Sequence, residues 1–211
     1  LGLLSADQIL GRDLIALFNQ ISSLTVETDY QRILVAPNYL KQELINLIRR
    51  EAENHLSGQA GLIRFKMNSL VDHELIEELY LASKKGVQIE LVVRGICSFR
   101  MSEVAKYQNV RIRSILGRFL EHSRIYSFRN SGNPEFFIGS ADLMDRNLNR
   151  RIETLVRVED LRHKGYLDQI FSNSFSDSIL HWWMDDSDKW RKSHGLNIDM
   201  HDYQSEEALI D

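Results

Sequence analysis

The chain has 211 residues, of which 43% are hydrophobic and 27% are charged, with only 2 prolines and 11 glycines. This composition is that of an ordinary globular protein and excludes wholesale disorder, collagen and long coiled-coil arrays. No segment approaches the roughly 18 apolar residues that a membrane-spanning helix needs. The single cysteine, Cys97, has no partner for an internal disulfide, which favours a reducing cytoplasm. The chain begins at Leu1 rather than at methionine, so we expect it to belong to a longer protein.

Charge is unevenly distributed along the sequence. Between Arg94 and Arg157 there are 12 Lys and Arg against 6 Asp and Glu; the rest of the chain has 14 against 24, and the net charge is −4. Arginine forms bidentate hydrogen bonds with phosphate, so this block predicts local recognition of an anion. An isoelectric point near 6.0 disfavours a general nucleic-acid binder. A surface of solvated ion pairs is the alternative interpretation.

Helical and alternating spacings of apolar residues predict the elements of the first half of the chain. In chain order they are a helix over 5–18, a strand over 33–37, a helix over 38–56, a strand over 62–66 and a helix over 72–85. Asn38 is expected to cap the second helix, and Gly86 to end the third.

The second half is richer in strands. We expect strands over 87–93, 110–115, 123–128, 135–139 and 153–158, followed by a closing helix over 160–180. After Trp183 the chain becomes polar and acidic, which predicts a terminal helix fraying into a poorly ordered tail. Alternating strands and helices followed by closely spaced strands indicate an α/β fold with a mixed sheet.

The first candidate site residue is Arg94. It stands where the strand over 87–93 ends, and Gly95 lets the backbone turn tightly there. Ligands of open α/β sheets bind at the carboxyl ends of strands, which makes Arg94 a candidate for anion binding. Alternatively, its side chain merely caps a backbone carbonyl.

His122 and Arg124 are the second candidate pair. On an extended strand, residues two apart face the same way, so these side chains would form a phosphate-binding arrangement with a possible proton donor. A purely structural histidine is the alternative. Glu121 is expected on the opposite face, exposed or paired with an arginine.

A third segment, 137–153, combines a glycine turn with basic residues. Gly139 and Ser140 after a strand suggest an anion-binding nest of exposed N–H groups. Arg146 and its neighbouring arginines add donors, and Glu153 could orient a histidine or an arginine. A solvated charge run is the alternative.

Several site classes are excluded by missing motifs. The histidines have no metal-ligand spacing, and no CxxC, HExxH, GxxxxGK[ST] or GxGxxG occurs, which argues against zinc, P-loop and Rossmann sites. Cys97 is expected to be a buried small residue. Trp182, Trp183 and Trp190 are expected to serve packing or an interface.

Four strings in order closely resemble the polyphosphate kinase family: KMNSLVD (66–72), LYLASKKGVQIELVVRGICS (79–98), SILGRFLEHSRIYSF (114–128) and GSADLMDRNLNRRIE (139–153). These large bacterial enzymes reversibly move the terminal phosphate of ATP onto inorganic polyphosphate. The resemblance runs over about residues 3–180 and covers the second of two halves that each have a phospholipase D-like fold.

The resemblance implies roles for particular residues. Arg94 and His122 would line the ATP site, and His122 would act as a general acid/base opposite a phosphorylated histidine in the preceding half. The HSR and GSAD strings resemble the phospholipase D signature, HxK followed by GSxN. Arg124 replaces its lysine and Asp142 its asparagine, which counts against free phosphodiesterase activity.

The resemblance also implies an organisation. We expect residues 1–24 to end the preceding domain or to form a leading helix, 25–183 to form the phospholipase D-like domain with a mixed sheet flanked by helices, and 184–211 to form a partly disordered acidic tail. This part would supply one portion of the ATP and polyphosphate site and be inactive alone. Magnesium would arrive with ATP, with its ligands mainly outside this chain.

Expected partners are ATP or ADP, inorganic polyphosphate, the missing N-terminal half and further copies of the complete enzyme, with no nucleic acid and no transmembrane segment. The enzyme would be cytoplasmic, or membrane-associated as a complex. Arg118, Arg124 and Arg146 are expected to help hold the polyanion. Two alternatives remain at this point: a phosphodiesterase or nuclease with His122 as nucleophile, and a non-catalytic polyanion-binding domain.

Overall fold

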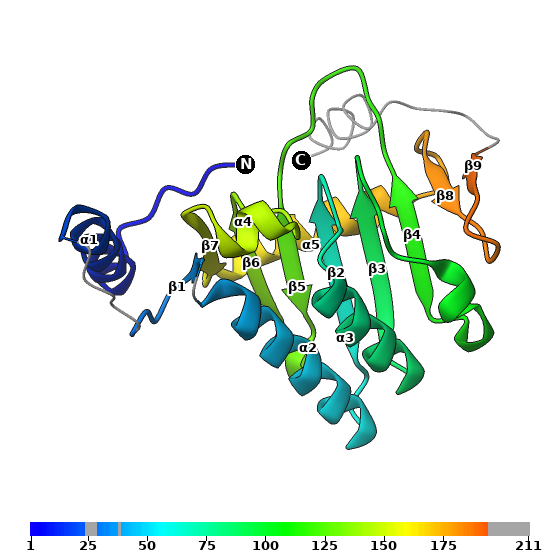
Figure 1. Ribbon diagram of the computed structural model, residues 1–211, viewed down its shortest axis with the longest axis horizontal. Helices are drawn as coiled ribbons and strands as arrows, with labels where there is room; N and C mark the ends of the chain where they lie inside the picture. Colours follow the sequence, from blue (N-terminus) through cyan, green and yellow to red (C-terminus); the bar gives the residue numbers. More distant parts are fainter. Residues whose placement is uncertain (24–28, 38, 194–211) are drawn as a thin grey trace.

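The computed structural model describes residues 1–23, 29–37 and 39–193. These residues form a nine-stranded mixed sheet with the order β1-β7-β6-β5-β2-β3-β4-β8-β9 (Figure 1). The strands are β1 (Ile33–Ala36), β2 (Leu62–Met67), β3 (Gln88–Val93), β4 (Val110–Ser114), β5 (Ile125–Phe128), β6 (Glu135–Gly139), β7 (Glu153–Val158), β8 (Trp182–Met184) and β9 (Trp190–Lys192). β2, β3 and β4 are parallel, and the other neighbours are antiparallel. The prediction of an α/β fold with a mixed sheet is confirmed.

Helices cover both faces of this sheet. The α-helices are α1 (Gln8–Ser23), α2 (Leu40–Leu56), α3 (His73–Lys84), α4 (Asp145–Asn149) and α5 (Leu161–Ser174), and the 3-10 helices are η1 (Met101–Glu103), η2 (Ala105–Tyr107) and η3 (Asn130–Gly132). α2 and α3 lie on one face and α5 crosses behind the other, while α1 stands at the β1 edge (Figure 1). No described helix is long and apolar enough to cross a membrane.

Side chains of β2 point alternately to the two faces of the sheet. Phe65 and Met67 belong to the large core beneath α2 and α3. Arg64 points the other way, where it forms an ion pair with Asp168 of α5 and lies 4.9 Å from the ring centre of Phe171. Because side chains on a strand alternate with a period of two, even-numbered residues of β2 face α5.

The sheet topology gathers several chain segments at one edge. β2 and β3 are parallel, so both end there, and β6 ends there too because β5, which is antiparallel to β2, starts at this edge. Backbone hydrogen bonds then tie the emerging loops together: Leu70 N donates to the Ile96 carbonyl at 2.8 Å, and Val71 N to the Leu143 carbonyl at 2.8 Å. Loops that follow β2, β3 and β6 therefore form one connected surface.

Most predicted elements are confirmed, with shifted ends. The leading helix runs from Gln8 to Ser23 rather than over 5–18. Asp72 caps α3 by accepting a hydrogen bond from Leu75 N at 3.1 Å, and Gly86 ends it with φ +101°. Asn38 lies outside the described residues; the residue that precedes α2 is Tyr39.

The prediction for the chain after α5 is wrong. α5 ends at Ser174 instead of near 180, and Trp182–Lys192 forms a β-hairpin in place of a terminal helix. Asp185 holds the turn, since its carboxylate accepts hydrogen bonds from the N–H groups of Ser187 and Lys189 at 3.0 and 2.9 Å. The acidic side chain of Asp185 therefore stabilises the turn of the hairpin. The hairpin also covers β4, which would otherwise be an open edge strand. The predicted disordered tail, from residue 194 onward, lies outside the described residues.

We predict that Gly139→Ala destabilises the fold. A Cβ atom at Gly139 would lie 1.9 Å from the carbonyl oxygen of Thr154, so β6 and β7 would have to separate. The free energy of unfolding should fall by about 1–3 kcal/mol or more in urea denaturation. Gly165→Ala on α5 is the matched control, because a Cβ there meets nothing within 4 Å and alanine favours helix. Equal stability of the two variants would contradict this reading.

Candidate functional site

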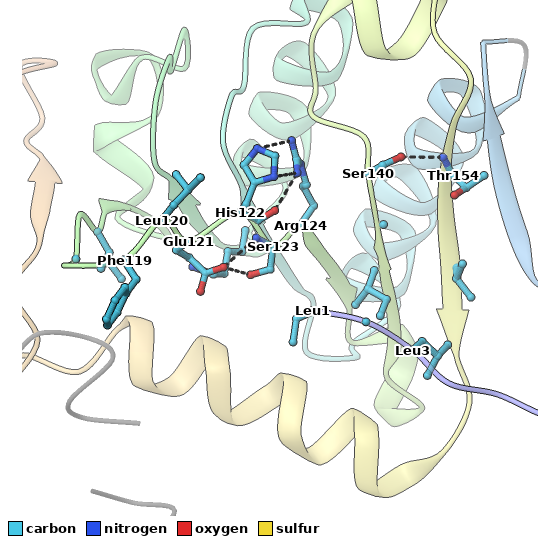
Figure 2. A pocket seen from close by; sticks show the side chains of 17 residues that line it. Leu1, Leu3, Phe119, Leu120, Glu121, His122, Ser123, Arg124, Ser140 and Thr154 are labelled. Carbon is cyan, nitrogen blue, oxygen red and sulfur yellow. Dashed lines mark hydrogen bonds between the residues drawn. The ribbon is translucent and has the colours of Figure 1, made fainter. Parts of the chain in front are cut away.

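A cavity of about 770 Å³ opens where the β4–β5 loop meets the ends of β2 and β6 (Figure 2). Its polar wall includes His122 and Arg124, which the sequence singled out, and also Lys66, Glu121 and Ser123. The apolar wall is formed by residues that include Leu1, Leu3, Ile115, Phe119, Leu120, Ile138 and Val156.

A buried ion pair between Arg124 and Asp142 lies beside this cavity. Nη2 of Arg124 is 2.8 Å from Oδ2 of Asp142 and Nε is 3.2 Å from Oδ1, with side-chain exposures of 10% and 7%. Asn68 adds two donors, since its backbone N and its Nδ2 lie 2.8 and 3.2 Å from Oδ1. Burial alone would raise the pKa of Asp142, but hydrogen bonds from Arg124 and Asn68 outweigh it and lower that pKa.

Arg124 also fixes the imidazole of His122. Nη1 of Arg124 lies 2.8 Å from Nδ1 of His122 and 2.9 Å from its carbonyl oxygen (Figure 2). A guanidinium can only donate hydrogen bonds, so Nδ1 accepts and the neutral ring carries its proton on Nε2. The His122 side chain is exposed. Nε2 lies 3.4 Å from Nη2 of the same guanidinium, so Arg124 stands against both ring nitrogens and holds Nδ1 the more closely.

Arg94 joins the same network through Asn68. Nε of Arg94 donates to Oδ1 of Asn68 at 2.8 Å, and Gly95 N donates to the Asn68 carbonyl at 2.8 Å. A Cβ at Gly95 would be 2.9 Å from that carbonyl oxygen, so glycine permits this close approach. The terminal Nη groups of Arg94 donate to no described residue, and they remain available to a ligand. Arg94 does not itself line the cavity.

His122 and Arg124 lie side by side, but the predicted strand that was to place them on one face is wrong here. β5 begins at Ile125, so both residues belong to the preceding loop and not to a strand over 123–128. They lie on the same side because the Arg124 side chain returns to the His122 ring and carbonyl. Strand periodicity was not the cause.

Three other expectations need correction. Gly139 and Ser140 do not form an anion nest, because their N–H groups donate to the carbonyls of Arg124 at 3.4 Å and Thr154 at 3.0 Å. Glu153 accepts from Nδ2 of Asn147 at 2.6 Å and contacts no histidine or arginine of the described segments. Glu121 is half-buried and bound to Ser123 rather than to an arginine.

Arg118 and Arg146 are not brought into the cavity. Arg118 is exposed on the β4–β5 loop, with its guanidinium 5.8 Å from the ring centre of Phe119. Arg146 is exposed on α4.

The expectation that Cys97 is buried holds in part. Cys97 is half-buried against the core, and burial raises the pKa of its thiol to about 11.

The sequence patterns did not single out Asn68 and Lys66, which the structure places in the network and at the cavity wall. Both stand at the carboxyl end of the predicted strand over 62–66, where ligands of open α/β sheets bind. Their position in the KMNSLVD string was the available signal.

The described residues do not suit a magnesium ion. They contain no cluster of three or more His, Cys, Asp or Glu side chains. The carboxylates nearest the site are already engaged, Asp142 by Arg124 and Asn68, and Glu121 by Ser123. Magnesium prefers carboxylate oxygens with free lone pairs together with water and phosphate.

Comparison with known proteins points to one family. The family model described as "Polyphosphate kinase C-terminal domain 2" matches residues 33–204. The polyphosphate kinase of Streptomyces coelicolor is 42% identical over 212 residues, covering 100% of this chain and 28% of that protein. That of a Synechocystis species is 46% identical over 182 residues, covering 86% of this chain and 25% of that protein.

A solved structure agrees with the sequence relatives. The crystal structure of polyphosphate kinase from Porphyromonas gingivalis has a TM-score of 0.88 at 33% identity, covering 97% of this chain and 32% of that chain. The chain thus spans about 28% of the length of a relative such as the Streptomyces coelicolor protein.

We predict that Asp142→Asn lowers the free energy of unfolding by about 3 kcal/mol at neutral pH, because it leaves Arg124 buried without a counter-charge. The folded-state pKa of Asp142 lies below 3.8, so the pair contributes above that pH and its contribution is lost as pH falls through the lowered pKa. The difference between parent and variant in urea denaturation should therefore shrink below about pH 4.

Asp168→Asn is the matched control for this experiment. Asp168 also pairs with a shielded arginine, Arg64, but its own side chain is 54% exposed, so its loss should cost less. A difference between parent and Asp142→Asn that is small at pH 7, or that grows on acidification, would contradict the prediction.

Proposed function

The chain belongs to the polyphosphate kinase family, and from this premise we propose that it supplies one half of an active site for reversible phosphate transfer between ATP and inorganic polyphosphate. The observation that carries the proposal is a continuous hydrogen-bonded network from Arg94 through Asn68, Asp142 and Arg124 to His122. It joins Arg94, whose Nη groups have no partner among the described residues, to an oriented imidazole at one edge of the sheet.

Arg94 is proposed to bind phosphate oxygens of the nucleotide. Its Nε is held by Asn68, which leaves the guanidinium fork directed by a fixed partner. Arginine recognises phosphate through two parallel N–H groups, and a preorganised fork loses little side-chain entropy on binding. The half-buried position strengthens the interaction relative to an exposed one.

His122 is proposed to assist the transferred phosphate group as a general acid/base. While Nδ1 accepts from Arg124, the Nε2–H group can donate a hydrogen bond to an oxygen of the moving phosphate. Transfer of the proton itself requires the imidazolium, so in the acid/base step Nδ1 leaves Arg124 and is protonated before Nε2 gives its proton to the phosphate, and the reverse reaction returns it. The N–H groups of Arg124 donate to Asp142 and His122. We therefore propose that Arg124 positions His122 and does not contact the polyanion directly. Exposed Arg118 and Arg146 are proposed as polyphosphate contacts.

The geometry disfavours the phosphodiesterase alternative. A nucleophilic histidine attacks through an unprotonated ring nitrogen. In this loop Nδ1 accepts from Nη1 of Arg124 at 2.8 Å and Nε2 lies 3.4 Å from Nη2 of the same guanidinium, so Arg124 stands against both ring nitrogens. We propose instead that the nucleophilic group comes from the part of the enzyme that precedes this chain, and that magnesium is held by nucleotide phosphates and by that part.

The test uses a full-length polyphosphate kinase that carries this sequence as its C-terminal part. His122→Ala should lower kcat for polyphosphate synthesis by about a hundredfold to ten-thousandfold, the range for loss of a general acid/base. Arg94→Ala should instead act mainly through the KM for ATP. His163→Ala is the matched control, because His163 is exposed on α5 and does not line the cavity. Turnover of His122→Ala within a few-fold of the parent would refute the acid/base role.

A further inference from the structure

Lys66 is a buried cation that the network above does not use. It is the fifth residue of β2 and lies between Val92 of β3 and Ile125 of β5. Like Arg64 on the same strand, it points toward the α5 face of the sheet. The residue is only 4% exposed, and yet it lines the 770 Å³ cavity. Its ammonium group is therefore withdrawn from bulk water at the wall of an open site.

Within the described part of the chain, Lys66 has no hydrogen-bonding or ion-pair partner. The contrast with Arg64 is informative, because Arg64 has both a carboxylate, Asp168, and an aromatic ring, Phe171, against its guanidinium. A buried charge without a direct partner opposes folding. Proteins keep such groups where they bind something, so the missing partner points to a ligand.

The charges around Lys66 favour an anion as that ligand. Burial lowers the pKa of its ammonium group, Glu121 opposes this at a distance, and Arg94 lowers the pKa further by repulsion. The attraction is mutual, since Lys66 lowers the pKa of Glu121. Glu121 nevertheless forms no ion pair with Lys66 among the described residues, and its hydrogen bonds go to the backbone N of Ser123 at 2.9 Å and to the Ser123 hydroxyl. An anion near Lys66 and Arg94 would relieve the repulsion between these two cations.

The cavity next to Lys66 also supplies hydroxyl groups. Ser140 and Thr154 line it (Figure 2), as does Lys66, whereas the hydroxyl of Ser123 already donates to Glu121. Hydroxyl donors combined with an ammonium group suit the tetrahedral oxygens of a phosphate group. The volume of about 770 Å³ is larger than a single phosphate requires, so a chain of phosphates can enter.

We infer that Lys66 forms a second phosphate-binding subsite, distinct from Arg94, which holds a phosphate group of the substrates inside this cavity. The inference rests on the proposed function for the identity of those substrates. The phosphate comes either from the polyphosphate chain or from the nucleotide, and separate kinetic constants for the two distinguish these sources.

The experiment compares Lys66→Met with the parent in a full-length polyphosphate kinase that carries this sequence. Methionine keeps the length and removes the charge. The KM for polyphosphate should rise by about ten- to a hundredfold if the polyphosphate chain occupies the subsite, which corresponds to the loss of one charge-assisted hydrogen bond. A rise confined to the KM for the nucleotide would support the subsite and assign it to the nucleotide. Unchanged KM values for both substrates would overturn the inference.

Two further variants separate binding from structure. Lys164→Met is the matched control, because Lys164 is 8% exposed on α5 and does not line the cavity, so neither KM should change. Lys66→Arg keeps a cation at the site and should retain affinity within about threefold of the parent. Failure of the arginine variant to bind better than the methionine variant would count against a charge-based subsite.

Thermal unfolding and direct binding complete the test. Removing an unpartnered buried ammonium should leave the melting temperature of Lys66→Met equal to or above that of the parent. Sodium tripolyphosphate, titrated calorimetrically into the same proteins, should bind the parent more tightly than Lys66→Met. If the parent shows no phosphate transfer, the proposed function fails, whereas this binding difference still decides the subsite. A lower melting temperature with unchanged tripolyphosphate affinity would make Lys66 a structural counter-charge for Glu121 and overturn the inference.

Discussion

The buried ion pair between Arg124 and Asp142 is the interaction on which the site depends. Asp142 follows β6, Arg124 precedes β5, and Asn68 follows β2, so one carboxylate joins three segments that are distant in sequence. Because both charged side chains are shielded from water, the pair is strong only while its hydrogen bonds are complete. Completeness requires that the guanidinium be shared with His122. The same guanidinium therefore stabilises this edge of the sheet and orients the imidazole of His122.

Close backbone contacts make this arrangement possible. Gly95 lets the end of β3 approach the carbonyl of Asn68, and Gly139 lets β6 approach Thr154 of β7. A side chain at either position would push the loops apart by more than a hydrogen bond tolerates. The two glycines of the quoted RG and GS strings therefore serve the geometry of the edge. Neither offers an anion-binding nest.

The sequence predicted most of the sheet, because buried strands and amphipathic helices impose their own periods on apolar residues. It failed after α5, where the acidic residues that were read as a tail include Asp185, which holds the turn of the hairpin that covers β4. Such turns depend on one side chain accepting local N–H groups, a feature that charge counting does not detect. The hairpin is recognised only when the open edge of β4 is known.

The site residues could likewise be predicted only in part. Arg94, His122 and Arg124 could be selected from residue type and position at strand ends, and the structure joins them in one network. Their connection could not be predicted, because it passes through Asn68 and Asp142 and depends on sheet topology. Lys66 could not be selected for a related reason. In an alternating strand a lysine is expected to face solvent, and only the position of the helix across that face shows that it is buried.

The orientation of His122 by Arg124 is the central claim, and nitrogen-15 NMR of the imidazole ring tests it most directly. The account predicts that in the neutral ring Nδ1 is the unprotonated acceptor and Nε2 carries the proton. Arg124→Met should abolish this preference and leave a mixture of both tautomers. A parent ring with its proton on Nδ1, or a tautomer ratio unchanged by Arg124→Met, would contradict the account.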